Sequence, residues 1–247
     1  MAFAPAALSV HSSSKWPRAD RRGSACTVAA ACLLAGCSVS GPLSALDPAG
    51  PGAAPIAQVW WVMFTGALLL LLMMTALGLY AALRRRARPP RVSTRVLLVG
   101  GGLALPVVVL TALLAWGVAS GHALLPLATR EPVFVVEVTG RQWLWTARYP
   151  AHPQAATEPN RIDVPAGVPV DVHVRTLDVI HSFWVPRLGG KIDAIPGRVN
   201  VLRLRADAPG VYRGVCAEFC GTGHPVMNFT VHAHAPDALA LRLGAAR

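Results

Sequence analysis

The chain has 247 residues, of which 53% are hydrophobic and only 14% are charged, and its formal net charge is +11. A composition this apolar is unusual for a soluble protein, and the length allows one ordinary domain with additional segments. The positive charge alone would suggest nucleic-acid binding. However, the arginines cluster beside apolar runs, where such clusters set membrane topology. We therefore expect contact with membrane lipid and no nucleic-acid partner.

Residues 1–36 have the pattern of a secretory signal peptide, in which basic residues precede a short apolar run and small residues before a cleavage site. The ending Leu-Ala-Gly-Cys at 34–37 resembles the bacterial lipoprotein box. It implies cleavage before Cys37 and lipidation of the Cys37 sulfur. An uncleaved or non-lipidated segment is the alternative. Residues 37–55 are then expected to be a periplasmic linker.

Residues 56–119 are predicted to form a transmembrane hairpin. The runs 56–83 and 96–119 are long enough to cross a hydrocarbon core of about 30 Å as helices. Pro106 and the glycines 100–102 interrupt the second run, which membrane helices tolerate. The connection 84–95 contains six arginines and is therefore placed in the cytoplasm. Both chain ends, and a C-terminal domain of residues 120–247, are then expected on the periplasmic side.

The exported domain is predicted to be an all-β barrel or sandwich. Four segments are rich in β-branched residues or alternate polar with apolar ones, namely 133–139, 168–174, 199–205 and 228–234. Pro/Gly turns separate these predicted strands. The only helix expected here lies at 237–243. Three histidines on alternating strand positions are expected to be exposed and are not taken as ligands: His173, His232 and His234.

The stretch CAEFCGTGHPVM at 216–227 gathers two thiols, an imidazole and a thioether. Copper favours thiolate and thioether ligands together with imidazole. Cys220, His224 and Met227 have the spacing of a loop that supplies three ligands of a blue-copper site. A second histidine must come from elsewhere, and His181, after a predicted strand, is the best candidate.

A site for a single copper ion does not need Cys216. Two thiolates four residues apart can bridge two metal ions, each terminated by one histidine, and the carbonyl of Glu218 could complete the ligand set. The alternatives are a disulfide, which is common for cysteine pairs in an oxidising compartment, and zinc, which rarely recruits methionine. The joint occurrence of all these residues favours a pair of copper ions.

Three motifs give the chain a family resemblance. They are VTGRQWLW at 138–145, DVIHSFWVP at 178–186 with its continuation KIDAIPGR at 191–198, and the stretch 216–227. With these motifs, residues 45–234 resemble subunit II of a bacterial cytochrome c oxidase, which carries the dinuclear copper centre called CuA. The resemblance implies a two-pass protein of the bacterial plasma membrane, with a membrane α-helical hairpin followed by an all-β cupredoxin-like barrel.

The resemblance also implies a role for each matching residue. Trp143 would receive the electron from cytochrome c. The side chain of Glu218 would also reach a magnesium ion at the boundary with the catalytic subunit, and Asp193 and Arg198 would pack on that subunit. The implied partners are this haem-copper subunit I, the other oxidase subunits and cytochrome c, with oxygen reduction and proton pumping in subunit I. The implied ligands of the two copper ions are His181, Cys216, Cys220, His224, Met227 and the main-chain carbonyl of Glu218.

Several positions depart from the family pattern. Arg141 and Leu144 replace a usual histidine and aromatic, while Arg148 and Leu177 stand where acids are common. Since acidic patches in relatives steer a basic cytochrome c, we expect a less basic or membrane-attached donor here. Val99 replaces a glutamate that serves proton uptake in many relatives, which suggests a different proton route. No cytochrome c domain is expected after the barrel.

Three other kinds of membrane protein share parts of this pattern. A quinol oxidase subunit would lack the copper ligands, all of which are present. A membrane-anchored copper chaperone would need a thioredoxin-like αβ alternation that is missing. The CuA subunit of a copper-containing nitric oxide reductase shares the hairpin, the barrel and the copper centre, and remains the closest alternative.

Overall fold

The structure, a computed structural model, describes residues 39–83, 93–122, 125–129 and 131–244. The expected signal peptide at 1–36, Cys37 and most of the predicted cytoplasmic loop 84–95 lie outside these residues. Among the described residues, two apolar helical segments come first and a β domain follows.

Two long helical segments occupy the two apolar runs. Helix α2 spans Ala54–Leu83, while the second run forms a π-helix η1 at Val96–Ala104 followed by α3 at Leu105–His122. Their lengths of 30 and 27 residues and mean hydropathies of 2.3 and 2.4 suffice to cross a membrane, and their apolar windows are not buried. The predicted pair of membrane-capable helices is confirmed.

The π-helix η1 contains the glycine run ahead of Pro106. The N–H of Leu105 donates to the carbonyl of Gly100, five residues earlier, instead of the usual four. Proline has no N–H to donate and its ring crowds the preceding turn. A local widening of the helix is a common response to such a disturbance, so the interruption seen in the sequence changes the helical pitch without ending the helix.

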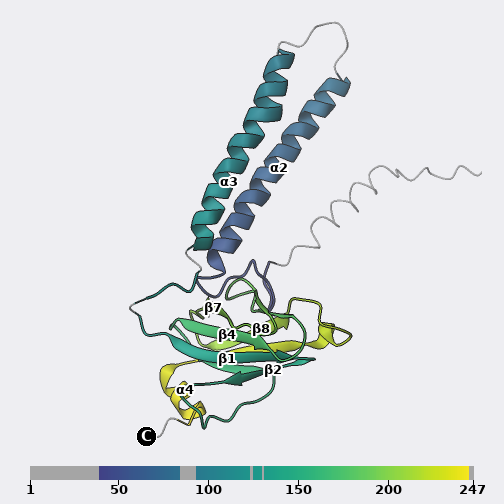
Figure 1. Ribbon diagram of the computed structural model, residues 1–247. Helices are drawn as coiled ribbons and strands as arrows, with labels where there is room; N and C mark the ends of the chain where they lie inside the picture. The colour runs from purple at the N-terminus through teal and green to yellow at the C-terminus, as the bar shows by residue number, and fades with distance from the viewer. Residues whose placement is uncertain (1–38, 84–92, 123–124, 130, 245–247) are drawn as a thin grey trace, which may run out of the picture. The chain divides into compact units, whose positions relative to one another are not determined.

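The β domain consists of two sheets, as predicted for a cupredoxin-like barrel or sandwich. The first sheet, whose strands are labelled in Figure 1, has the order β2 (Leu144–Arg148), β1 (Phe134–Arg141), β4 (Val170–Thr176), β7 (Asn200–Leu204). The second sheet has the order β3 (Arg161–Pro165), β9 (Asn228–His234), β8 (Gly210–Cys216), β5 (His181–Trp184), β6 (Ile192–Ala194). Strands β1 and β4 pair in parallel, as do β3 and β9, and the other pairs are antiparallel.

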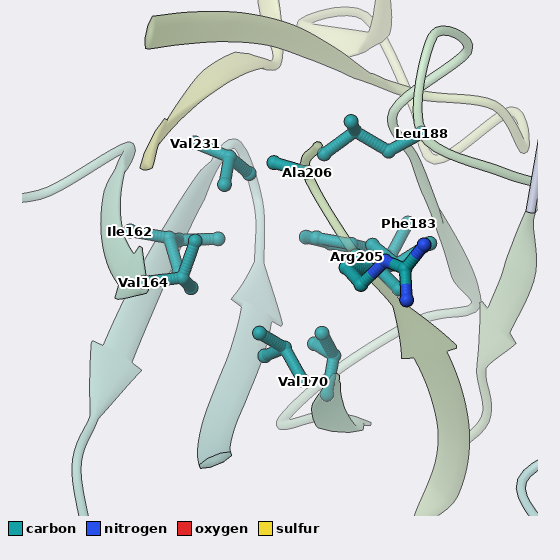
Figure 2. A pocket seen from close by; sticks show the side chains of 10 residues that line it. Ile162, Val164, Val170, Phe183, Leu188, Arg205, Ala206 and Val231 are labelled. Carbon is teal, nitrogen blue, oxygen red and sulfur yellow. The ribbon is translucent and has the colours of Figure 1, made fainter. Parts of the chain in front are cut away.

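The core lies between the two sheets and follows from the period-2 alternation of each strand. On β4 the valines at 170, 172 and 174 are buried, while Asp171, His173 and Arg175 point outward. Side chains from both sheets meet in Figure 2, where Ile162, Val164 and Val231 face Val170 and Phe183. The space left between them is about 10 Å³ and almost wholly apolar, which is at most the room for one water without polar partners to hold it. This core is therefore packed and offers no ligand site.

Four connections meet at one end of the β domain: residues 142–143, 177–180, 195–199 and 217–227. The strand register brings them together, because Gly140 pairs with Thr176, Val174 with Asn200, and Val215 with Asn228. We call this the loop end. Four predicted copper ligands lie in its 217–227 connection, and Cys216 and His181 are the strand residues that border it.

The segment before α2 is bound to the β domain away from these loops. Asp47 forms an ion pair of 3.0 Å with Arg187, and Ala49 donates to the carbonyl of Arg187 and accepts from the N–H of Asp207. A side chain at Gly50 would collide with the carbonyl of Arg205. Glycine is therefore required at this close approach.

The C-terminal helix lies close to its expected position, whereas three histidines are less exposed than expected. The short helix is present as α4 at Pro236–Arg242, one residue earlier than predicted. The expectation that His173, His232 and His234 are exposed is wrong, since all three are half-buried. His234 contacts Asp163 at 2.7 Å and His232 contacts Thr230 at 3.1 Å.

Candidate metal centre

Strand pairing sets the positions of the sulfur and imidazole side chains. Cys216 is the last residue of β8, and His181 is the first residue of the neighbouring strand β5. The β8–β9 hairpin is closed by a hydrogen bond from the N–H of Cys216 to the carbonyl of Met227, 3.0 Å long. The intervening loop contains Cys220 and a 3₁₀ turn that begins at His224. The hairpin thus returns residues 220, 224 and 227 to the same place as Cys216.

The donor atoms cluster around the two sulfurs, which lie 3.9 Å apart as free cysteines. Nδ1 of His181 lies 3.8 Å and the carbonyl oxygen of Glu218 3.3 Å from Sγ of Cys216. Nδ1 of His224 and Sδ of Met227 each lie 3.7 Å from Sγ of Cys220. All six sequence-predicted ligand groups are therefore brought together.

These separations suit ligands of a shared metal. At ~2.3 Å from sulfur and ~2.0 Å from imidazole nitrogen, two ligands at a tetrahedral angle lie roughly 3.5–3.8 Å apart. The observed sulfur–sulfur and sulfur–nitrogen distances are within a few tenths of an ångström of this. The donors are also shielded from water, with exposed fractions of 6% for Cys216, 3% for Cys220, 1% for Met227 and 0% for His181. His181 with the two cysteines forms a group able to hold a metal ion.

The Cys220 thiol favours its protonated form in the absence of a cation. Burial, helped by the nearby Cys216 sulfur, raises the pKa of the Cys220 thiol. A buried thiolate without a compensating charge is unfavourable, whereas metal ligation requires it and releases the proton. The sulfurs are thus arranged to bind a cation.

A second layer of residues holds the ligand loop. Nε2 of Gln142 donates to the carbonyl of Cys220 at 2.7 Å, and Nε1 of Trp143 donates to the same oxygen at 3.2 Å. A side chain at Gly223 would collide with the indole of Trp143, so the ring lies flat against the loop. Trp143 is 38% exposed. It therefore links the surface directly to a ligand residue.

Asp178 connects this turn to His181. Its Oδ1 lies 2.8 Å from Nε2 of His181, and its Oδ2 accepts from the N–H of Gln142 at 2.7 Å. Burial by itself would raise the pKa of Asp178. The hydrogen bonds from the Gln142 N–H, from His181 and from its neighbours outweigh this and hold the pKa at about 2. The carboxylate is therefore charged at neutral pH and fixes the ring so that Nδ1 faces the sulfurs.

Trp145 supports His181 from the core side. The two rings meet edge to face with centroids 5.8 Å apart, and Trp145 also contacts Phe183 and Phe229. Gly140 lies beside them, where a side chain would crowd both Trp145 and His181. His181 is therefore held by a carboxylate on one nitrogen and by aromatic packing on its ring.

Comparison with known proteins finds similarity to one family. Residues 151–234 match the model of "Cytochrome C oxidase subunit II, periplasmic domain". Cytochrome c oxidase subunit 2 of Alkalihalophilus pseudofirmus is 32% identical over 214 residues, which cover 80% of this chain and 60% of that protein. The chain is therefore similar to subunit II of cytochrome c oxidases.

Other relatives match shorter stretches. Subunit 2 of Apis koschevnikovi is 34% identical over 118 residues, 41% of this chain and 52% of that protein. The chain thus spans about half to three-fifths of the length of the curated relatives. The solved periplasmic domain of subunit II of cytochrome oxidase from Bradyrhizobium japonicum is 30% identical, covering 49% of this chain and 96% of that one, with a TM-score of 0.44.

The remaining predicted positions lie beside the cluster. Asp193 accepts from Ser182, the neighbour of His181, at 2.8 Å and from Lys191 at 3.1 Å. The exposed carboxylate of Glu218 lies 3.9 Å from Nζ of Lys191. Arg198 is exposed in the 195–199 connection. None of these side chains contacts the sulfurs.

If His181 is a copper ligand, replacing Asp178 by asparagine is expected to lower the copper affinity of the chain roughly 10–100-fold, the usual cost of losing the partner of a ligating histidine. The amide keeps the shape but removes the charge that orients His181. Competition with a chromophoric chelator, on the full chain in detergent, measures the affinity. Asp171→Asn is the matched control, since among the described residues Asp171 forms its ion pair with Arg203, on an outer face. Equal affinities in the two variants would contradict the role of Asp178.

Proposed function

We propose that the chain is the electron-accepting subunit of a respiratory cytochrome c oxidase. In this proposal it takes electrons from a cytochrome c at a dinuclear CuA centre and passes them to the haem-copper subunit, which reduces oxygen to water and pumps protons. The observation that carries it is the convergence of two buried sulfurs, 3.9 Å apart, with two imidazoles and a thioether. The proposed copper ligands are His181, Cys216, Cys220, His224, Met227 and the carbonyl of Glu218.

The donor set supports copper over the alternatives. Zinc sites use cysteine, histidine and carboxylates and rarely methionine, but Met227 here points its sulfur into the cluster. A blue-copper site needs one cysteine, whereas Cys216 and Cys220 lie symmetrically between the other donors. Two copper ions bridged by both sulfurs would supply a centre that gains and loses one electron with little change in geometry.

The chain's own residues would keep that change small. The ligands are attached to paired strands, and burial excludes water from the sulfurs. Asp178 and Trp145 hold His181, while Gln142 and Trp143 hold the carbonyl of Cys220. The partly exposed indole of Trp143 would be the point at which the donor's electron enters.

The proposal extends to topology and to a second metal. Residues 1–36 would be a signal peptide, with lipid on Cys37, and residues 37–55 and 120–247 would lie on the periplasmic side of a two-pass hairpin. Magnesium prefers oxygen ligands and is usually bound by one or two carboxylates with other groups. The exposed Glu218 carboxylate could supply one ligand at the boundary with the catalytic subunit. Asp193 and Arg198 would contact the same partner.

The test is the copper content and electron paramagnetic resonance spectrum of the full chain, purified in detergent and loaded with copper. We expect two coppers per chain that share one unpaired electron. One copper with an ordinary blue-copper spectrum, or no copper with Cys216 and Cys220 joined as a disulfide, would refute the dinuclear centre.

A further inference from the structure

The outer face of the first sheet is rich in arginine. Positions that alternate with the buried valines bring Arg175 opposite Thr139, Arg148 opposite Glu137 and Arg203 opposite Asp171. Arg141 adds a fourth arginine at the end of β1. With four arginines and two carboxylates, the face has a net charge of +2. We call the four arginines at 141, 148, 175 and 203 the arginine face.

The carboxylates on this face are already engaged. Glu137 lies 2.7 Å from Arg148 and 3.9 Å from Arg175, while Asp171 lies 2.7 Å from Arg203. Arg141 is exposed and has no ion pair among the described residues. The excess positive charge therefore lies toward the loop end, next to Trp143.

Exposed apolar side chains adjoin Arg141 at the same place. The N–H of Leu177 donates to the carbonyl of Gly140, so Leu177 lies beside the end of β1. Leu177 is 70% exposed, Val179 40% and Trp143 38%. Single exposed apolar residues are ordinary, but three together at the mouth of a buried centre form the apolar middle of a small interface with a charged rim.

The carboxylates at the loop end are already engaged. Asp178 lies between Leu177 and Val179, and both its oxygens accept hydrogen bonds, from Gln142, His181, Thr176 and Val179. The exposed Glu218 carboxylate lies 3.9 Å from Nζ of Lys191. A basic protein approaching Trp143 would meet unpaired Arg141 and the excess charge behind it. An acidic protein would find a complementary surface.

We propose that Trp143, Leu177 and Val179, with the arginine face, form the docking surface for an acidic one-electron carrier. The carrier's carboxylates would surround the exposed edge of its redox group. It would give up one electron, which the copper-loaded chain takes up, and no bond is made or broken and no proton moves. The inference rests on the proposed function, because it assigns the carrier for the same centre.

Stopped-flow reduction of the copper-loaded full chain in detergent tests the proposal. The probes are an acidic and a basic c-type cytochrome of similar potential. At low salt we expect the acidic protein to react faster, with a rate that falls roughly tenfold or more as salt screens the attraction. The basic protein should react slowly, at a rate that salt leaves unchanged or raises.

Two charge reversals sharpen the test. Arg141→Glu should slow the acidic carrier several-fold at low salt and have little effect at high salt. Arg213→Glu is the control, because Arg213 is exposed on β8 of the other sheet and has no ion pair among the described residues. A faster basic carrier, or equal effects of the two reversals, would overturn the inference while leaving the proposed function intact. If neither carrier reduces a chain with the paired-copper spectrum, the proposed electron acceptance itself fails, and the inference fails with it.

Discussion

Replacing Cys216 by serine is expected to reduce the bound copper from two ions per chain to one at most and to abolish the shared-electron spectrum. A serine hydroxyl is a poor ligand for soft copper ions and does not ionise at neutral pH. Cys220, His224 and Met227 would still surround one position, since the latter two lie 3.7 Å from the Cys220 sulfur. The remaining ion should therefore give a single-copper spectrum.

The variant Met227→Leu tests the effect of losing a terminal ligand, for comparison with the loss of the bridging ligand in Cys216→Ser. Leucine keeps the volume but removes one donor sulfur, so this variant should retain two coppers and the shared electron, with an altered reduction potential. Met73→Leu on α2 is the matched control, because Met73 is 46% exposed on an apolar helix. The measurements are the copper content by atomic absorption and the electron paramagnetic resonance spectrum of all three variants. Two coppers and an unchanged spectrum in Cys216→Ser would rule out bridging by both sulfurs.

The clustering of the candidate donor groups could be predicted because most of them are local in sequence. Cys216, Cys220, His224 and Met227 lie within one loop, whose tight spacing already limits how far apart they can be. Only His181 is distant, and its position after a predicted strand made it the best candidate. The strands were recognisable from β-branched runs, and the helices from their apolar length.

The supporting residues could not be predicted in the same way. Gln142 and Asp178 act through hydrogen bonds to a backbone carbonyl, a backbone N–H and a ring nitrogen. Such contacts depend on which loops meet, and this follows from sheet order instead of from periodicity. Asp178 had a signal, since it lies three residues before His181, but the sequence alone does not show where a carboxylate points. The half-buried histidines were misjudged for a related reason.

His234 is half-buried because it belongs to a cluster around Asp163. The carboxylate is 3% exposed and accepts bonds from Arg161 at 2.9 Å and from His234 at 2.7 Å. Arg242 of α4 lies 3.3 Å from the other oxygen, an ion-pair contact without hydrogen-bond geometry. The backbone N–H of Asp163 donates to the hydroxyl of Tyr149. One buried acid thus joins β3, β9 and the C-terminal helix.

Replacing Asp163 by alanine is expected to lower the free energy of unfolding of the β domain by about 2–4 kcal/mol. Removing one partner of a buried pair costs about 3–5 kcal/mol, and we reduce this because Arg161 and Arg242 are 27% and 23% exposed and can regain some hydration. Denaturant unfolding of the full chain in detergent, followed by tryptophan fluorescence, measures it. Asp171→Ala, which breaks one pair on an outer face, should cost no more than about 1 kcal/mol.

The same cluster gives the stability a definite pH dependence. Burial would raise the pKa of Asp163, but the hydrogen bonds from Arg161 and His234 and the nearby guanidinium charges outweigh it and lower the pKa. A carboxyl group whose pKa is lower in the folded state stabilises the fold above its unfolded pKa of about 3.9, and this stabilisation is lost as the pH falls through the folded pKa. The difference in unfolding free energy between the native chain and Asp163→Asn should therefore be constant at neutral pH and shrink below about pH 4. A difference that persists unchanged into acid would mean that Asp163 acts through its shape and not through its charge.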